Sequence, residues 1–180
     1  MGQNKFFTIV VVSILMLNKL YSQRKPSHVE SIKIVKHPSS MKKISMDSLN
    51  LLSKNGAVKI YGHDFKDSYY TNGVLIYSMI STASPADKKD LAGIQKSVIG
   101  MLRWSPNIYI IDTSFIDIIN NKSFLYIGYH KENKWYIRFY SDYTDDEKYL
   151  FGYAEFDHSR ENEAWRFLRD YLSGVQFINH

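Results

Sequence analysis

Residues 123–140 read SFLYIGYHKENKWYIRFY, two aromatic-rich stretches on either side of a polar segment. Aromatic and β-branched residues favour strands, so residues 123–130 and 135–140 predict a β-hairpin around residues 131–134. If His130 faces Trp135, one face carries Tyr126, Gly128, His130, Trp135, Ile137 and Phe139, and the other carries Leu125, Ile127, Tyr129, Tyr136, Arg138 and Tyr140. Both faces are largely apolar or aromatic, which predicts a sheet covered on both sides.

The flanking sequence extends this sheet and supplies the helices that cover it. Strands are expected at residues 57–61, 73–80, 108–112, 115–119, 149–156 and 175–178, with a turn at Asn120-Asn121 and a polar loop over residues 62–72. Helices are expected at residues 48–54, capped by Asp47, at residues 85–103, opened by Ser84-Pro85, and from about residue 157 to Leu172, closed by Gly174. The pattern predicts an α+β fold, a mainly antiparallel sheet covered by helices.

The long helix carries small residues on one side, at Gly93, Ser97 and Gly100. A glycine inside a helix costs about 1 kcal/mol relative to alanine, so a structural reason is expected for two of them. We expect close packing against the sheet, with a groove beside the helix as the alternative.

The order of these elements resembles the PsbP-like α/β/α sandwich. The resemblance covers residues 57–180 and depends on the strand before the long helix, the three consecutive antiparallel strands, and the closing helix followed by Ser173 to Phe177 (SGVQF). This family includes extrinsic photosystem proteins, a Ran-binding import factor and small exported bacterial proteins of unknown function. The resemblance implies a binding or scaffolding domain and provides no catalytic motif to transfer.

The N-terminus has the features of a secretory signal peptide. Residues 1–22 contain Lys5, the apolar stretch FFTIVVVSILML at residues 6–17, and Ser22 as a small residue at the cleavage site. A membrane span needs about 20 apolar residues, so cleavage is expected, and retention as an anchor is the alternative. The predicted organisation is a signal peptide at 1–22, a mobile segment at 23–46 with a possible edge strand, and one domain at 47–180. The expected location is secreted or periplasmic.

Composition narrows the classes of partner. The chain contains no cysteine, which excludes disulfides and thiolate chemistry. Removal of the leader with Lys5 and Lys19 reduces the basic residues from 23 to 21 against 18 acidic, a net charge of +3. This mild charge does not suggest nucleic acid, and no cofactor is predicted. A protein or a small ligand of the bacterial cell envelope is the expected partner, with no transmembrane span after cleavage.

No catalytic signature is present, so no catalytic residue is assigned. Nucleophile-elbow, zinc-protease and phosphate-loop motifs are all missing from the sequence. The alternative to a binding domain is a hydrolase-like enzyme of unrecognised type with a polar cluster at His63, Asp64 and Asp112.

Arg138 is the main candidate for ligand binding. It lies between Tyr136 and Tyr140 on one strand face, where its guanidinium could stack on aromatic rings or grip an anionic group. Tyr129, Tyr136, Tyr140 and Tyr153 are candidates to line a ligand groove on the same surface. The competing interpretation is structural, with the arginine laid over a sheet face, or at an edge, salt-bridged to a nearby acid, and with the tyrosines packed in the core and at its boundary.

Four carboxylates lie in residues 142–147, at Asp142, Asp145, Asp146 and Glu147. Hard cations prefer such ligands, but the spacing of a calcium loop is missing and Lys148 adjoins. A solvated turn is expected, and no metal site is assigned.

Overall fold

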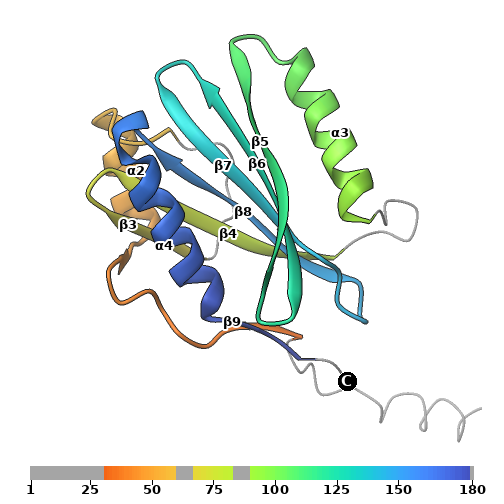
Figure 1. Cartoon of the computed structure of the whole chain (residues 1–180). Helices are drawn as coiled ribbons and strands as arrows, with labels where there is room; N and C mark the ends of the chain where they lie inside the picture. Colours follow the sequence, from red (N-terminus) through yellow and green to blue (C-terminus); the bar gives the residue numbers. More distant parts are fainter. Residues whose placement is uncertain (1–30, 60–66, 83–89, 179–180) are drawn as a thin grey trace, which may run out of the picture. The chain divides into compact units, whose positions relative to one another are not determined.

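The structure is a computed structural model that describes residues 31–59, 67–82 and 90–178. Within these residues, seven strands form an antiparallel sheet in the order β2-β3-β4-β8-β7-β6-β5 (Figure 1). Its strands are β2 (Lys42–Lys43), β3 (Asp67–Thr71), β4 (Val74–Thr82), β5 (Ile108–Ile119), β6 (Lys122–Lys131), β7 (Lys134–Ser141) and β8 (Lys148–Phe156). A separate pair joins β1 (Ile32–Ile34) to β9 (Val175–Phe177).

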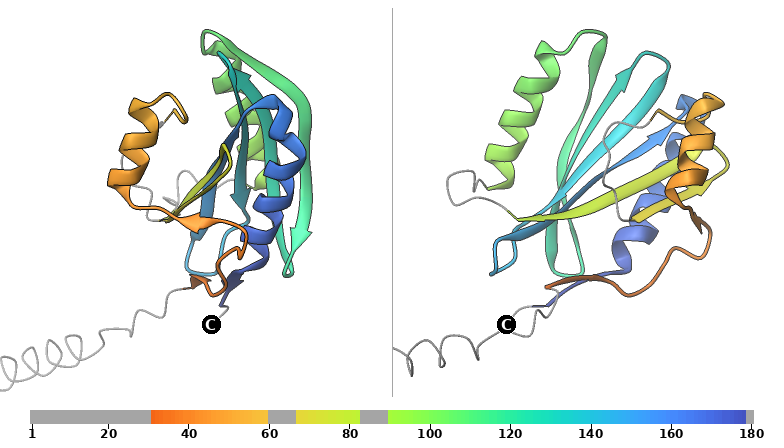
Figure 2. Two further views of the ribbon diagram at one scale, coloured as in Figure 1. Left: turned by 90° about the vertical axis from the view of Figure 1, so that its left-hand side faces the viewer. Right: turned by 180° about the vertical axis from the view of Figure 1, so that it is seen from behind.

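Helices cover both faces of the large sheet. Helix α4 (Glu161–Ser173), preceded by the short 3₁₀ turn η1 (His158–Arg160), packs on one face. Helices α2 (Met46–Lys54) and α3 (Leu91–Trp104) lie on the other face, over opposite edges of the sheet (Figure 2). The predicted α+β class, a mainly antiparallel sheet covered by helices, is confirmed.

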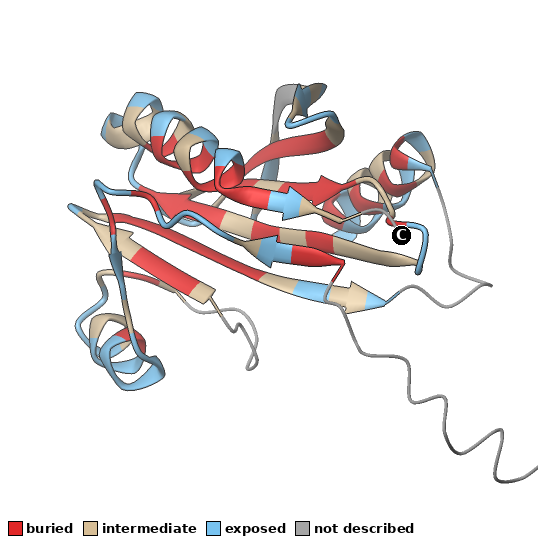
Figure 3. Ribbon diagram, turned by 90° about the horizontal axis from the view of Figure 1, so that it is seen from below, coloured by how far each residue is buried: buried red, intermediate tan, exposed pale blue. Residues whose placement is uncertain are grey.

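The register of the central hairpin is the one assumed in the sequence analysis. His130 pairs with Trp135, and Ile127 pairs with Arg138. Buried positions concentrate on the central strands and on the helix sides that face them (Figure 3). On the α4 side the core includes Tyr126, Ile137, Phe139, Leu168, Tyr171 and Leu172. The two-sided burial predicted from the hairpin is therefore present.

Two glycines allow close packing. A Cβ at Gly152 in β8 would lie 2.2 Å from the Tyr77 carbonyl oxygen and 2.6 Å from the Phe139 ring. A Cβ at Gly174 would lie 2.0 Å from the Lys36 carbonyl oxygen. Gly174 is the C-cap of α4 as expected, but its φ of −86° shows that this close approach, and not a left-handed conformation, requires glycine there.

The close packing expected on the small-residue side of α3 is not found at Gly100. A Cβ added at Gly100 would meet no atom within 4 Å, so close packing does not explain this glycine. The inward stripe consists of the predicted Leu91, Ile94, Val98 and Leu102.

Several element boundaries predicted from the sequence were wrong. Residues 67–71, expected within a loop, form β3, whose Tyr69 is fully buried. Residues 57–59 form no strand, and the rest of that expected strand lies outside the described residues. Residues 108–119 form one strand, β5, with a register shift between Ile110 and Ser114 in place of a break.

The helix starts also differ. Helix α2 is capped by Ser45, whose hydroxyl accepts from the Ser48 amide at 3.2 Å, and not by Asp47. Helix α3 begins at Leu91 after Asp90, whose carboxylate accepts from the Gly93 amide at 2.6 Å. The expected start at Ser84-Pro85 lies outside the described residues.

Candidate functional site

Arg138 lies in the middle of the sheet face that carries α2 and α3. Across the sheet its row runs from Ile127 in β6 through Arg138 in β7 to Tyr153 in β8 and Tyr77 in β4. Ile127 belongs to the core under α3, and Tyr77 belongs to the core under α2. Arg138 and Tyr153, between these two cores, are only partly buried. We call Arg138, Tyr140, Tyr153 and Glu155 the central strip.

Two tyrosine rings flank the guanidinium of Arg138. Its Cζ lies 5.2 Å from the centroid of Tyr140 and 4.9 Å from that of Tyr153, within the range of cation–π contacts. No carboxylate among the described residues forms an ion pair with Arg138, and its buried Nε has no hydrogen-bond partner there. The salt-bridged arginine of the structural interpretation is therefore not found in the described part of the chain.

The other predicted tyrosines lie on the same sheet face as Arg138. Tyr129 and Tyr136 stack with ring centroids 5.1 Å apart and are buried in the core under α3, together with Tyr140. The structure thus brings Arg138 and the predicted tyrosines onto one face, where Arg138 and Tyr153 are partly exposed and the others are buried. Tyr129, Tyr136 and Tyr140 can support a ligand at Arg138, and contact with it remains a prediction.

Glu155 is a member of the central strip that the sequence analysis did not single out. It is 1% exposed and pairs across the sheet with Tyr136 and Leu75. The Lys59 amide donates to its Oε1 at 2.5 Å, while Oε2 has no hydrogen-bond partner among the described residues. Burial raises the pKa of this carboxyl from 4.5 to about 7. A single acid in the apolar strand KYLFGYAEF, facing the same way as Tyr153, was the available signal.

The tyrosines of this face are neutral hydrogen-bonding groups. Burial raises the pKa of Tyr140 and of Tyr153 above the usual value of 10, and the nearby Arg138 guanidinium opposes that rise. Burial also raises the pKa of Tyr77, with Glu155 as the next cause. Arg138 is consequently the group of the central strip that carries a full charge at neutral pH.

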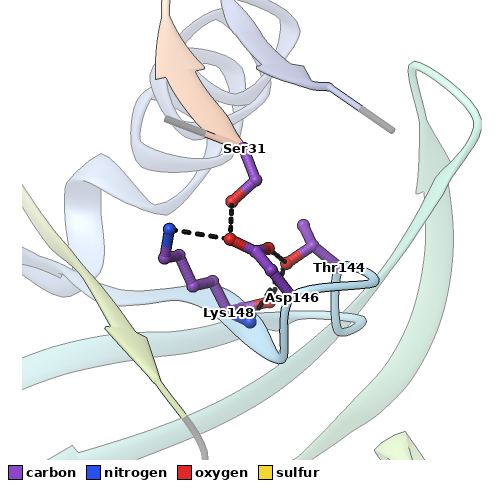
Figure 4. A network of polar contacts seen from close by, with 4 residues as sticks. All are labelled: Ser31, Thr144, Asp146 and Lys148. Atoms are coloured by element: carbon purple, nitrogen blue, oxygen red, sulfur yellow. Dashed lines mark hydrogen bonds and ion pairs between the residues drawn. The ribbon is translucent and has the colours of Figure 1, made fainter. Parts of the chain in front are cut away.

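In the acidic loop, the carboxylate of Asp146 is bound by side chains of the chain itself. Asp146 accepts from Ser31 at 2.9 Å and from the Thr144 hydroxyl at 2.6 Å, and it forms an ion pair with Lys148 at 2.7 Å (Figure 4). Hydrogen bonds from Lys148 and Thr144 hold the pKa of this carboxyl well below its usual value. Among the described residues, no three His, Asp or Glu side chains form a group able to hold a metal.

The alternative catalytic cluster is not placed by the structure. His63 and Asp64 lie outside the described residues, and Asp112 is placed only as a backbone position of β5. In the described part of the chain, no helix is long and apolar enough to cross a membrane.

Comparisons with known proteins bear on the fold. No family model and no curated protein matches the chain. Among solved structures, the chain is similar to the solution structure of cyanobacterial PsbP (CyanoP) from Synechocystis sp. PCC 6803. The match has 9% sequence identity and a TM-score of 0.46, and it covers 85% of this chain and 96% of the other. This solved protein bears the name of the family that the order of elements resembles, and the similarity concerns the fold alone.

Proposed function

We propose that this chain is a non-enzymatic binding or accessory domain that acts outside the cytoplasm, and that it holds an anionic group of its ligand at Arg138. The observation that carries the proposal is the guanidinium of Arg138, partly exposed between two tyrosine rings with no carboxylate partner among the described residues. A buried or half-buried charge is ordinarily paired, and an unpaired arginine on a sheet face is suited to receive a carboxylate or a phosphate.

The surroundings of Arg138 support an anion and not a cation. Glu155 is the nearest acid along the strip, and its pKa of about 7 means that it is largely protonated below neutral pH. The tyrosines remain neutral, so they add hydroxyl groups and aromatic surface without cancelling the charge. Arginine presents a planar fork of donors, which matches the two oxygens of a carboxylate or phosphate.

A panel of anions tests this proposal. Thermal unfolding of the chain should shift upward with increasing succinate or inorganic phosphate, because a ligand that binds only the folded state stabilises it. Arg138→Gln should abolish the shift. Arg166→Gln is the matched control, since Arg166 also stacks on an aromatic ring, Phe167 at 4.9 Å, but lies on the exposed side of α4. An equal shift in the wild type and Arg138→Gln would refute the assignment of the anion to Arg138.

The proposed location depends on the leader at residues 1–22. Fractionation of the producing cell, followed by mass spectrometry of the recovered chain, provides the test. Recovery from the periplasm or medium with Gln23 as the first residue supports export and cleavage. Recovery of intact chain from the cytosol would contradict it.

A further inference from the structure

The two edges of the large sheet differ in how they are protected. One edge is β2, a strand of two residues, Lys42 and Lys43. The other edge is β5, which has 12 residues, no lysine and no proline. Short strands, charged side chains, proline and β-bulges are the usual means by which proteins prevent an edge from pairing with another chain. The register shift of β5 lies before Ser114, and from Ser114 to Ile119 the strand is regular with Asp117 as its one charged residue. The described part of the structure leaves β5 without a strand on its outer side.

The hairpin turn shows which backbone groups of β5 point outward. Asn120 and Asn121 have φ values of 51° and 61°, which identify a type I′ turn closed by Ile119 and Lys122. The Ile119 carbonyl therefore faces β6, and in an antiparallel ladder the direction alternates along the strand. The N–H and C=O groups of Ser114, Ile116 and Ile118 consequently point to the free edge. The Ile118 amide, which donates to the Asp117 side chain at 2.8 Å, agrees with this direction.

Apolar side chains accompany these outward groups. Ile116 is 50% exposed and Ile118 is 69% exposed, both on the face that carries α3. The turn end of the hairpin extends past the end of α3 in two views (Figures 1 and 2). Exposed isoleucines beside a free edge gain from a partner that buries them.

We propose that β5 pairs antiparallel with β5 of a second copy, with Ile116 on the two-fold axis, to form a continuous sheet. In this register Ile116 faces the same residue of the second copy, and Ile118 faces its Ser114. The isoleucines of both copies then form one apolar cluster, because each Ile118 is diagonal to the other Ile116.

Charge selects this register over the neighbouring one. An axis at Asp117 would place two carboxylates directly opposite each other, which is unfavourable. With Ile116 on the axis the two Asp117 side chains are diagonal, and each already has Arg169 of α4 at 3.6 Å. In the dimer, each Asp117 carboxylate is therefore already paired with an arginine of its own copy.

Sedimentation of the purified chain across a wide range of protein concentration tests the dimer. The wild type should be a dimer, and Ile116→Pro should be a monomer with unchanged circular dichroism, because that amide faces away from β6. Ile116→Lys is a second dissociating variant. Leu51→Lys, an equally drastic change at a 60% exposed residue of α2, should leave the dimer intact. A monomeric wild type would overturn the proposal, as would a dimer that survives both Ile116 variants.

The register has its own test, because the chain contains no cysteine. Paired residues in an antiparallel ladder have Cα atoms about 5.5 Å apart, within the span of a disulfide. Ile116→Cys should therefore form a covalent dimer under mild oxidation. Ile118→Cys should not, because four residues of offset separate its two copies by about 13 Å. Cross-linking of Ile118→Cys but not Ile116→Cys would refute this register.

Discussion

Glu155 should make the stability of the fold fall as the pH rises. Its pKa in the folded state is about 7, against 4.5 for the free carboxyl. Because the folded state holds this proton more tightly, stability is greatest below pH 4.5 and decreases as the pH rises through about 7. At about 1.4 kcal/mol for each pH unit, this difference in pKa corresponds to a total loss of about 3 kcal/mol in the free energy of unfolding between acid and alkaline pH. About 2.5 kcal/mol of this should be lost between about pH 5 and about pH 8.

The measurement is urea unfolding of the wild type and Glu155→Gln over that pH range. The amide keeps an oxygen to accept from the Lys59 amide but carries no charge, so the part of the pH dependence due to Glu155 should disappear in the variant. Glu163→Gln, on the surface of α4, is the matched control and should follow the wild type. Parallel curves for the wild type and Glu155→Gln would show that the buried carboxyl does not titrate as the structure implies.

Three further changes follow from local geometry. Gly152→Ala should lower the free energy of unfolding by about 2 kcal/mol, because the new methyl group meets the Tyr77 carbonyl oxygen and the Phe139 ring; an unchanged urea midpoint would contradict this. Gly100→Ala should raise the free energy of unfolding by about 1 kcal/mol, since it improves helix propensity in open space, and a decrease would show hidden packing there. Asp146→Asn should destabilise by about 1 kcal/mol or less at neutral pH. Because the pKa of Asp146 is lowered on folding, this deficit should shrink as the pH falls below 3.8, which acid titration of both proteins can check.

His130 was assumed from the sequence to face Trp135, and the structure has this pairing. Alternation assigns side chains to the two faces, but both faces are apolar here, so the two-residue turn between Lys131 and Lys134 is what fixes the register. Strand β3 was not predicted, because DSYYT follows a polar stretch and its burial comes from pairing with β4 and from packing under α4. The prediction of two strands in place of β5 was wrong because a polar stretch was taken for a break between strands. A register shift passes through a polar Asp-Thr-Ser stretch that reads as a break.

The candidate site was only partly predictable. Arg138, Tyr136 and Tyr140 lie on one strand, so periodicity alone places these three on a common face. Tyr129 and Tyr153 join them from the neighbouring strands β6 and β8. Glu155 joins them from β8. Whether its carboxylate oxygens find hydrogen-bond donors depends on which residues surround it after folding. Whether Arg138 has an acidic partner is a long-range property too, since a carboxylate could come from any strand or helix of the sheet. The lack of one in the described residues is therefore information that the sequence could not supply.

The two proposals make a joint prediction, because the dimer would place both Arg138 side chains on the same side of one sheet. Paired residues of antiparallel strands point to the same face, so the α3 faces of the two copies would lie side by side. Two linked sites bind a chain of repeated anions more tightly than one site does. Long-chain polyphosphate should therefore bind the wild type at least about tenfold more tightly than the uncharged variant Ile116→Pro, while inorganic phosphate binds both equally. If Ile116→Pro binds both polyphosphate and inorganic phosphate more weakly by the same factor, the variant has damaged the site itself. If polyphosphate binds both proteins with equal affinity, pairing at the sheet edge does not contribute to anion binding.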